Sequence, residues 1–193
     1  MWQQILPGLR IKIFMTILLG VVYPLAMTGI CQLVFPHQAN GSLVTVDGKV
    51  IGSELIGQNF TKPEYFQPRP SAAGNDGYDA TASSASNYGP TNQKLVDRVK
   101  ASIEKFRKEN PDYTGPLPAD LVTASASGLD PHLSPDSARA QASRVAKVRG
   151  VTVEQIDQLI TQFTENPDLG LLGEPRVNVL KLNLALDRQF PPK

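Results

Sequence analysis

The sequence predicts an α+β fold: a single N-terminal transmembrane helix followed by one mixed α/β extracytoplasmic domain. Three observations support this prediction. Residues 13–35 contain no charged side chain, short β-branched runs flank a tight-turn dipeptide soon afterwards, and apolar residues in the second half of the chain recur at helical spacing. The chain has 193 residues, 41% of them hydrophobic and 19% charged, which is enough for one folded domain with a core.

The uncharged run at residues 13–35 predicts a helix that crosses a membrane. Its 23 residues, rising ~1.5 Å each, match a hydrocarbon layer about 30 Å thick. A buried core helix seldom stays uncharged for so long, and a cleaved signal peptide has a shorter apolar region. We therefore expect a retained anchor. Pro24, Gly20 and Gly29 would kink this helix or let a neighbouring helix approach closely, which makes them candidate contacts with a membrane partner.

The charges that flank this run predict its orientation. Arg10 and Lys12 precede it, whereas residues 36–45 contain no lysine or arginine. Positive charge stays on the cytoplasmic side of a membrane helix. We therefore expect residues 1–12 to be cytoplasmic and residues 36–193 to form a periplasmic domain at the bacterial inner membrane. The formal net charge of +1 lacks the basic footprint of a nucleic-acid-binding protein.

The extracytoplasmic domain should begin with a small β-hairpin. Residues 43–46 and 50–51 are β-branched or aliphatic and flank Asp47-Gly48, a dipeptide that tolerates the positive φ angles of a tight turn.

The next segment, residues 69–92, is rich in Gly, Ser, Ala and Asn. Its composition is typical of a flexible loop. Tyr78, Asn87 and Tyr88 could instead hold it in an ordered interaction loop, so disorder and an ordered loop both remain open.

An amphipathic helix should begin after Asn92. Apolar side chains recur there at helical spacing, namely Leu95, Val96, Val99, Ile103 and Phe106. The opposite face is basic. Asp97 and Glu104 break up its charge, which favours a solvated surface over contact with anionic lipid.

Two further helices have clear start signals. Ser134-Pro135-Asp136 combines a cap, a first-turn proline and a first-turn carboxylate, and predicts a helix that ends at Gly150. Its small residues Ala138, Ala142 and Ala146 should pack inward. Thr152 and Gln155 form a capping-box pattern for a helix that should bury Val153, Ile156, Leu159, Ile160 and Phe163. Residues 176–184 should form a strand that runs into a short helix.

The stretch LVTASASGLDPHLSP, residues 121–135, raises the question of a catalytic site. Ser125 or Ser127 could act as a nucleophile with Asp130 and His132 beside it. Working triads, however, assemble residues from distant parts of a chain, and no GxSxG motif is present. We therefore expect no catalytic residue here. Asp130 precedes a proline, so its carboxylate should have a fixed direction and bond nearby N–H groups or a partner.

Motifs for nucleotide or metal binding are weak. Gly52 to Gly57 has the spacing of a phosphate loop, but Gln58 and Asn59 replace the Lys-Ser/Thr pair that such a loop requires. Two histidines far apart and one cysteine predict no metal site.

Several long motifs, in order along the whole chain, are similar to those of one family. They are GSELIGQNF (residues 52–60), YFQPRPSA (65–72), SNYGPTN (86–92), DLVTASASGLDPHLSP (120–135) and GEPRVNVLKLNLALD (173–187). With the single anchor, they closely resemble the C subunit of the bacterial Kdp potassium-transporting ATPase, the KdpC family.

The resemblance implies an accessory subunit with no chemistry of its own. Its partners would be a channel-like potassium-translocating A subunit, a P-type ATP-hydrolysing B subunit and a small F subunit, together with membrane lipid. It would carry no cofactor of its own, with ATP possible through the ATPase subunit. The family is also described as a catalytic chaperone that raises the ATP affinity of the B subunit.

Three functions therefore compete. We favour a non-catalytic assembly subunit over a nucleotide-sensing chaperone and a membrane-anchored hydrolase that uses His132. The candidate nucleotide or partner contacts are Gln58, Ser127, Gly128 and Asp130, and the candidate partner-interface residues are Pro24, Gly20, Gly29, Arg69, Ser71, Asn87, Asp130 and His132.

Overall fold

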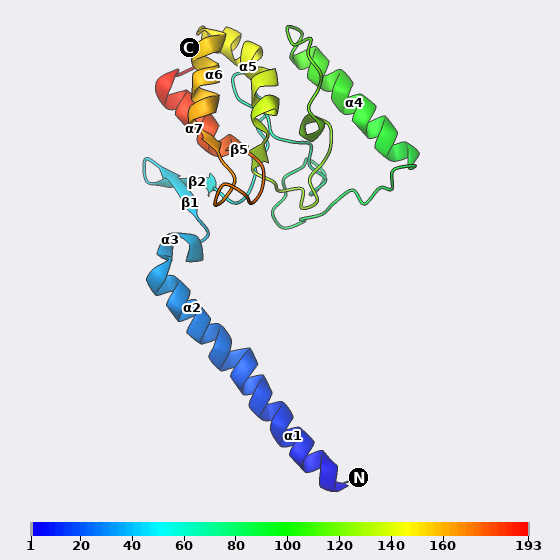
Figure 1. The fold of residues 1–193 in the computed structure, drawn as a ribbon, viewed down its shortest axis with the longest axis vertical. Helices are drawn as coiled ribbons and strands as arrows, with labels where there is room; N and C mark the ends of the chain where they lie inside the picture. Colours follow the sequence, from blue (N-terminus) through cyan, green and yellow to red (C-terminus); the bar gives the residue numbers. More distant parts are fainter. Residues whose placement is uncertain (1, 193) are drawn as a thin grey trace. The chain divides into compact units, whose positions relative to one another are not determined.

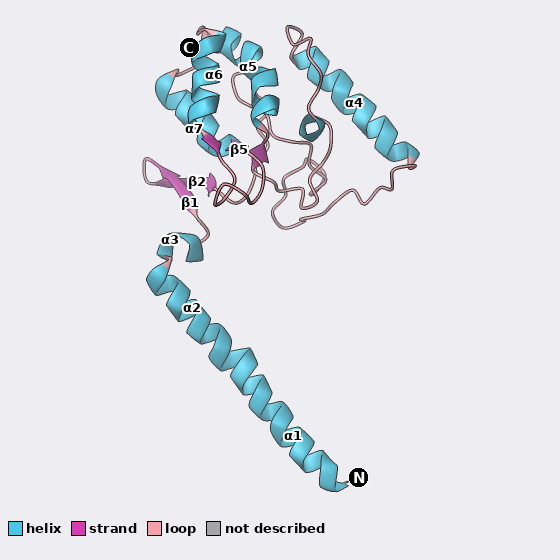
Figure 2. Cartoon of the chain, in the orientation of Figure 1, coloured by secondary structure: helices cyan, strands magenta, loops and turns pink. Residues whose placement is uncertain are grey.

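The computed structural model describes residues 2–192 and divides the chain into two compact units, with the boundary between Ile51 and Gly52. The predicted class is confirmed: an N-terminal helix long and apolar enough to cross a membrane comes before a domain of helices and small sheets (Figure 2).

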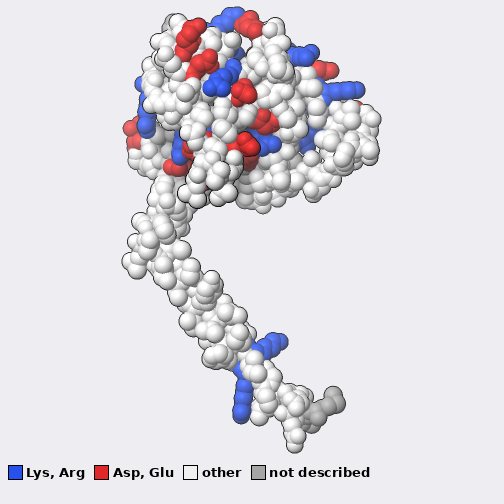
Figure 3. Space-filling view, viewed as in Figure 1, with Lys and Arg blue, Asp and Glu red and all other residues white. Residues whose placement is uncertain are grey.

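The first unit is dominated by one long helical segment. It consists of α1 (Trp2–Ile17), the π-helical turn η1 (Leu18–Val22) and α2 (Tyr23–Val34), drawn in blue in Figure 1. The candidate membrane span is Gln3–Val34, and none of its most apolar window is buried. The helix begins before the predicted start at residue 13, because Arg10 and Lys12 end the uncharged run without breaking helical geometry. Figure 3 shows basic side chains on the first half of this segment and none on the rest.

Pro24 and the two glycines shape the middle of this segment. Pro24 lies in the first turn of α2, directly after the π turn. A proline lacks the N–H that would bond the carbonyl four residues earlier, and a π turn is one way in which a helix accommodates that loss. A Cβ on Gly29 would meet nothing within 4 Å, and one on Gly20 only the Thr16 methyl at 3.9 Å. Both glycines therefore leave the helix backbone open to a neighbour.

The predicted hairpin is confirmed. After α3 (Pro36–Ala39), β1 (Leu43–Val46) and β2 (Lys49–Ser53) form a two-stranded sheet. Asp47 and Gly48 have φ angles of 49° and 78°, the positive values that the tight turn requires.

The second unit packs three helices against a small antiparallel sheet. The helices are α5 (Pro135–Arg149), α6 (Val153–Gln162) and α7 (Val179–Gln189), which lie together in Figure 1. The strands are β3 (His132–Leu133), β4 (Thr164–Glu165) and β5 (Arg176–Asn178), in the order β3-β5-β4. Val177 lies at the centre of the sheet, opposite Leu133 on one side and Thr164 on the other.

The start and stop signals of these helices are confirmed. The Thr152–Gln155 capping box is formed, and Gly150 ends α5 with φ 70°. The predicted strand runs directly into α7. One expectation is wrong: Val153 is 38% exposed, because the buried stripe of α6 starts one turn later, at Ile156.

The remaining helix, α4 (Gln93–Glu109), is capped by Asn92, as the sequence predicts. Phe106 is buried in the common core, while Val99 and Ile103 pack against its edge. After α4, a 3₁₀ turn, η2 (Ala119–Leu121), leads towards β3.

Residues 63–67, a turn that leads into an irregular stretch, cross the domain without a strand partner. The buried amides of Asn183 and Gln141 bond their backbone instead. Asn183 accepts from Phe66 N at 2.9 Å and donates to Phe66 O at 3.0 Å, and Gln141 bonds Gln67 N and O in the same way, at 2.8 and 3.0 Å. Each amide thus reproduces the pair of bonds that a neighbouring strand would make.

Two arginines of α5 complete this arrangement. Arg144 donates to the carbonyls of Pro63 and Tyr65, and Arg149 to the carbonyl of Glu64 at 3.0 Å. The Arg149 side chain is fully buried, pairs with Asp187 at 2.7 Å and lies 5.0 Å from the centroid of the Tyr65 ring. Burial lowers the pKa of Arg144, against the opposing charge of Glu109, which raises it. Both buried guanidinium groups therefore tie α5 to the turn at residues 63–65.

The cap of α5 allows a direct test of helix initiation. The Ser134 hydroxyl accepts from Ser137 N at 3.1 Å, and Asp120 accepts from Ser134 N at 2.8 Å. We predict that Ser134→Ala lowers the free energy of unfolding of the full chain by about 1 kcal/mol, because an N–H of the first turn loses its partner. Urea unfolding in detergent, followed by circular dichroism, measures the change.

Ser143→Ala is the matched control, since it makes the same substitution in the interior of α5. It should stay within about 0.5 kcal/mol of the wild type. Equal midpoints for Ser134→Ala and Ser143→Ala would show that the cap does not stabilise the helix.

Candidate functional site

Two loops far apart in sequence are hydrogen-bonded to each other. Ser84 N donates to Ser127 O at 3.1 Å, Ser83 Oγ donates to the same carbonyl at 3.0 Å, and Ser71 Oγ donates to Gly128 O at 2.6 Å. Residues 69–84 are therefore ordered against residues 124–131. For the loop at residues 69–92, this favours an ordered loop over disorder. We call residues 69–84 and 124–131 together the paired-loop surface.

Ser71 and Tyr78 organise the first of these loops. The Ser71 hydroxyl accepts from Tyr78 N at 2.8 Å and from Ala73 N at 3.1 Å. The Tyr78 hydroxyl donates to Arg69 O at 2.9 Å. Burial raises the pKa of Tyr78, the charge of Asp130 raises it further, and Arg69 lowers it. Tyr78 thus stays protonated and holds the loop as a donor, while Ser71 serves the fold of the loop.

Close backbone contacts explain two glycines. Gly128 has φ 68°, and a Cβ there would lie 2.8 Å from Ser84 O and 2.9 Å from Ala73 N. A Cβ on Gly57 would lie 2.6 Å from Asp130 O and would overlap the Tyr78 ring. Gly57 N also donates to Leu129 O at 2.8 Å. Glycine is required at both positions because another backbone passes directly over it.

Asp130 is the best-connected ionised group of the surface. Its carboxylate accepts from Arg69 Nη1 at 2.7 Å and from His132 N at 3.0 Å, and His132 Nδ1 lies 3.6 Å from it. Burial acts to raise the pKa of Asp130, but the hydrogen bonds from His132 and Arg69 outweigh it, so the pKa lies below its ordinary value. The carboxylate has a fixed direction, as predicted, and its bonds lie within the domain.

Ser125 and Ser127, the candidate nucleophiles of residues 121–135, bond the main chain of their own turn. Ser125 Oγ accepts from Gly128 N at 2.9 Å, and Ser127 Oγ accepts from Leu129 N at 3.1 Å. Asp130 is occupied by Arg69, and His132 lies on β3 opposite Asn178. The contacts of these groups therefore shape a loop, whereas a nucleophile would need a base aimed at it.

The remaining candidates are dispersed. Gln58 lies over Gly52, where a Cβ would overlap its amide, so this glycine spacing serves packing and not a phosphate cradle. Asn87 is exposed and has φ 48°. Pro24, Gly20 and Gly29 lie in the other unit, on the candidate membrane helix.

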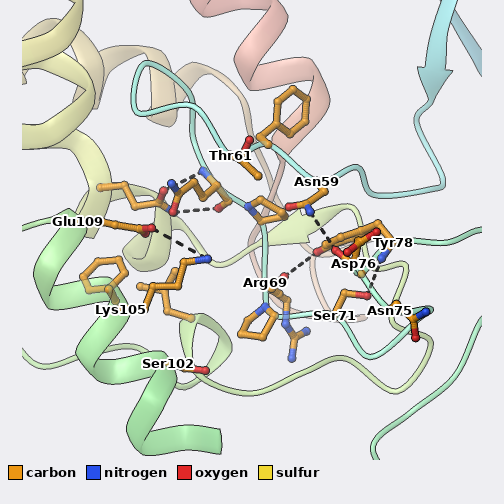
Figure 4. Close-up of a pocket in the computed structure, with 18 residues that line it drawn as sticks. Asn59, Thr61, Arg69, Ser71, Asn75, Asp76, Tyr78, Ser102, Lys105 and Glu109 are labelled. Atoms are coloured by element: carbon orange, nitrogen blue, oxygen red, sulfur yellow. Dashed lines mark hydrogen bonds and ion pairs between the residues drawn. The ribbon is translucent and has the colours of Figure 1, made fainter.

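A cavity of about 360 Å³ opens beside the paired-loop surface. Figure 4 shows Lys105 and Glu109 of α4 on one side of it, with Asn59, Asp76, Tyr78 and Ser71 on the other. Asn59 donates to Asp76 O at 3.0 Å, and Lys105 pairs with Glu109 at 4.0 Å. The lining holds two cations, Arg69 and Lys105, and two carboxylates, Asp76 and Glu109. This balance lacks the excess of positive charge that would attract a polyphosphate. Within residues 2–192, no group of three or more His, Cys, Asp or Glu side chains could hold a metal ion.

Sequence reasoning missed the residues that build the site. The pairing of Ser71 with Gly128 spans 57 positions, so no local pattern in the sequence indicates it.

Known proteins are similar to this chain over nearly its full length. The family described as "K+-transporting ATPase, c chain" (KdpC) matches residues 5–188. A "Potassium-transporting ATPase KdpC subunit" of Myxococcus xanthus is 57% identical over 193 residues, covering 100% of this chain and 91% of the relative. One of Rhodospirillum rubrum is 56% identical over 191 residues, covering 99% and 98%, and one of Polaromonas naphthalenivorans is 57% identical over 185 residues, covering 96% and 94%.

The pKa of Asp130 predicts how the domain responds to acid. The carboxyl binds protons less readily when folded, so its stabilising contribution is complete above its ordinary value of 3.8 and is lost as the pH falls through the folded value. We predict that Asp130→Asn lowers the urea midpoint at pH 7, and that its difference from the wild type shrinks below about pH 4.

Asp112→Asn is the control, because Asp112 is exposed and its lysine partner lies 3.7 Å away. It should leave the midpoint nearly unchanged throughout. A difference between wild type and Asp130→Asn that persists unchanged down to pH 2 would show that the charge of Asp130 does not stabilise the fold.

Proposed function

The chain belongs to the KdpC family of K+-transporting ATPase c chains, and we propose that it is a non-catalytic accessory subunit that assembles with and stabilises the other subunits. Family membership makes it a subunit of a potassium-transporting ATPase, which associates with further ATPase subunits. In our proposal these partners are the potassium-translocating A subunit, the ATP-hydrolysing B subunit and the small F subunit.

The paired-loop surface is the observation that carries the proposal. Its serines, its glycine turn and the Arg69–Asp130 ion pair are used to hold two loops together. Such a surface is rigid and already hydrogen-bonded, so ordering it on binding costs little. Ala126 and Ser127 on this surface, and Asn87 three residues beyond it, are exposed and available to a partner. These properties suit assembly better than bond-making chemistry.

The membrane helix supplies the second contact. Gly20 and Gly29 leave its backbone uncovered, and membrane helices pack closely where small residues face each other. Gly20 and Gly29 are nine residues apart, about two and a half helical turns, so they lie on different faces. We propose that one of these two faces lies beside a helix of the translocating subunit. The helix holds the accessory subunit in the bacterial inner membrane.

The proposal also includes an orientation of the helix in the membrane, which is inferred from the flanking charges. Arg10 and Lys12 lie at one end of the helix, and no lysine or arginine lies in residues 36–45 at the other. The N-terminus is then cytoplasmic and the second unit periplasmic. ATP is bound on the opposite side of the membrane, by the ATPase subunit, and this chain carries no cofactor of its own.

Protease accessibility tests this topology. We predict that protease added to intact spheroplasts removes a C-terminal epitope tag and spares an N-terminal one, because the basic end of the helix is retained inside. Inverted vesicles provide the control and should show the reverse pattern. Protection of the C-terminal tag in spheroplasts would place the domain in the cytoplasm and support the alternative function, a chaperone that raises ATP affinity.

A substitution on the paired-loop surface tests assembly. We predict that Ala126→Arg reduces co-purification with the A and B subunits at least about tenfold, since a charge buried at an interface without a partner is costly. Ala126 is exposed, so the domain should fold normally. Retention in detergent is quantified against the wild type.

Ala101→Arg is the matched control, since Ala101 is exposed on α4. It should be retained like the wild type. Full retention of Ala126→Arg would show that the paired-loop surface lies outside the interface.

A further inference from the structure

Three leucines project from the loop between β4 and β5. Leu169 is 91% exposed, Leu171 87% and Leu172 61%, the first two being the highest values among the exposed large apolar residues of residues 2–192. We call residues 168–172 the leucine hairpin. Single exposed leucines are ordinary on protein surfaces, whereas clusters of them mark binding sites.

The leucine hairpin is a defined structure. Asp168 and Leu172 exchange two main-chain hydrogen bonds, each 2.9 Å long, and Gly170 N donates to Pro167 O at 2.9 Å. These bonds close the tip, so its side chains are presented in a fixed arrangement.

An arginine braces the base of the hairpin. Arg176 on β5 lies opposite Glu165 on β4 and donates to its carboxylate at 3.2 Å. The same guanidinium lies 3.6 Å from the Asp168 carboxylate. Arg176 therefore connects the sheet to the first residue of the hairpin and limits its motion.

The conformation of the hairpin is unfavourable in the isolated domain, and no contact among the described residues of the domain offsets this. Leu169 has φ 54°, a left-handed conformation that costs about 1 kcal/mol for a residue with a side chain. Its side chain is left in water and contributes nothing to the core. A strained, braced and solvent-exposed apolar tip indicates a partner that covers it.

Charge identifies the chemistry of that partner. Residues 165–176 contain three carboxylates, on Glu165, Asp168 and Glu174, one arginine and no lysine or aromatic residue. The arginine, Arg176, is paired with Glu165 and Asp168, so the hairpin and its base keep a net negative charge. Loops that enter a lipid surface combine apolar residues with basic or aromatic ones, and carboxylates are repelled by anionic headgroups. A second copy of this chain would bring the same acidic groups face to face. The remaining occupant is a protein pocket with apolar walls and a neutral or basic rim.

We propose that Leu169 and Leu171 insert into an apolar pocket on the periplasmic face of a partner subunit of the transport ATPase. The inference rests on the proposed function, because it requires the domain to lie on that side of the membrane within the complex. Two leucine side chains bury only a small area. The hairpin is therefore one specific contact within a larger interface to which other parts of the chain contribute.

The test uses the full chain expressed with its partner subunits. Leu171 is replaced by a photo-crosslinking benzoylphenylalanine, and the irradiated complex is analysed by mass. We expect an adduct between this chain and the A or B subunit. In parallel, Leu169→Ser with Leu171→Ser should reduce retention in the detergent-purified complex at least about tenfold, through the loss of two buried side chains.

Val148→Ser, on the exposed face of α5, is the matched control and should be retained like the wild type. Unchanged thermal midpoints show that the variants fold. If the double variant does not fold, the crosslink still tests whether the hairpin contacts a partner subunit.

Adducts to lipid only, or to a second copy of this chain, would overturn the inference. The inference would also be overturned if the double variant folds and is retained in the complex as well as the wild-type chain is. Failure of the wild-type chain itself to co-purify would overturn the proposed function and this inference together.

Discussion

The second unit depends on satisfying the backbone of one irregular segment, which carries the buried Phe66. Residues 63–67 lack a strand partner, and a buried N–H or C=O without a hydrogen bond costs about 1–3 kcal/mol. Gln141 and Asn183 each bond both main-chain groups of one residue, and Arg144 and Arg149 cover the carbonyls that precede them. This requirement explains why polar side chains lie at the centre of an otherwise apolar helical core.

The position of the candidate site follows from that segment. Arg69 comes two residues after it, and from there the chain enters the loop that bonds residues 124–131. The second loop leads directly into β3 and the cap of α5, the helix that supplies Gln141 and both arginines. The core and the paired-loop surface are thus parts of one network, and a loop of Gly, Ser and Ala is ordered without large apolar side chains of its own.

Sequence reasoning succeeded where the signal is local. Caps such as Ser134 and Thr152, the Asp47-Gly48 turn and the apolar stripe of α6 are read within a few residues, and the structure has them. It could not foresee pairings such as Ser71 with Gly128, because hydrogen bonds between distant loops leave no periodic pattern. The same limit concealed the buried arginines of α5, which look solvated in a helical pattern. Asp130 illustrates the middle case: its fixed direction was predictable from Pro131, but its partner Arg69 was not.

In the proposed function, the paired-loop surface is covered when the subunit joins its complex. Amide hydrogen exchange measures this directly, on the unmodified full chain in detergent and in the purified ATPase. Amides of residues 69–84 and 124–131 should exchange at least about tenfold more slowly in the complex, while the exposed face of α6 is unchanged. Equal exchange of these loops in the free and assembled chain would show that this surface is not covered.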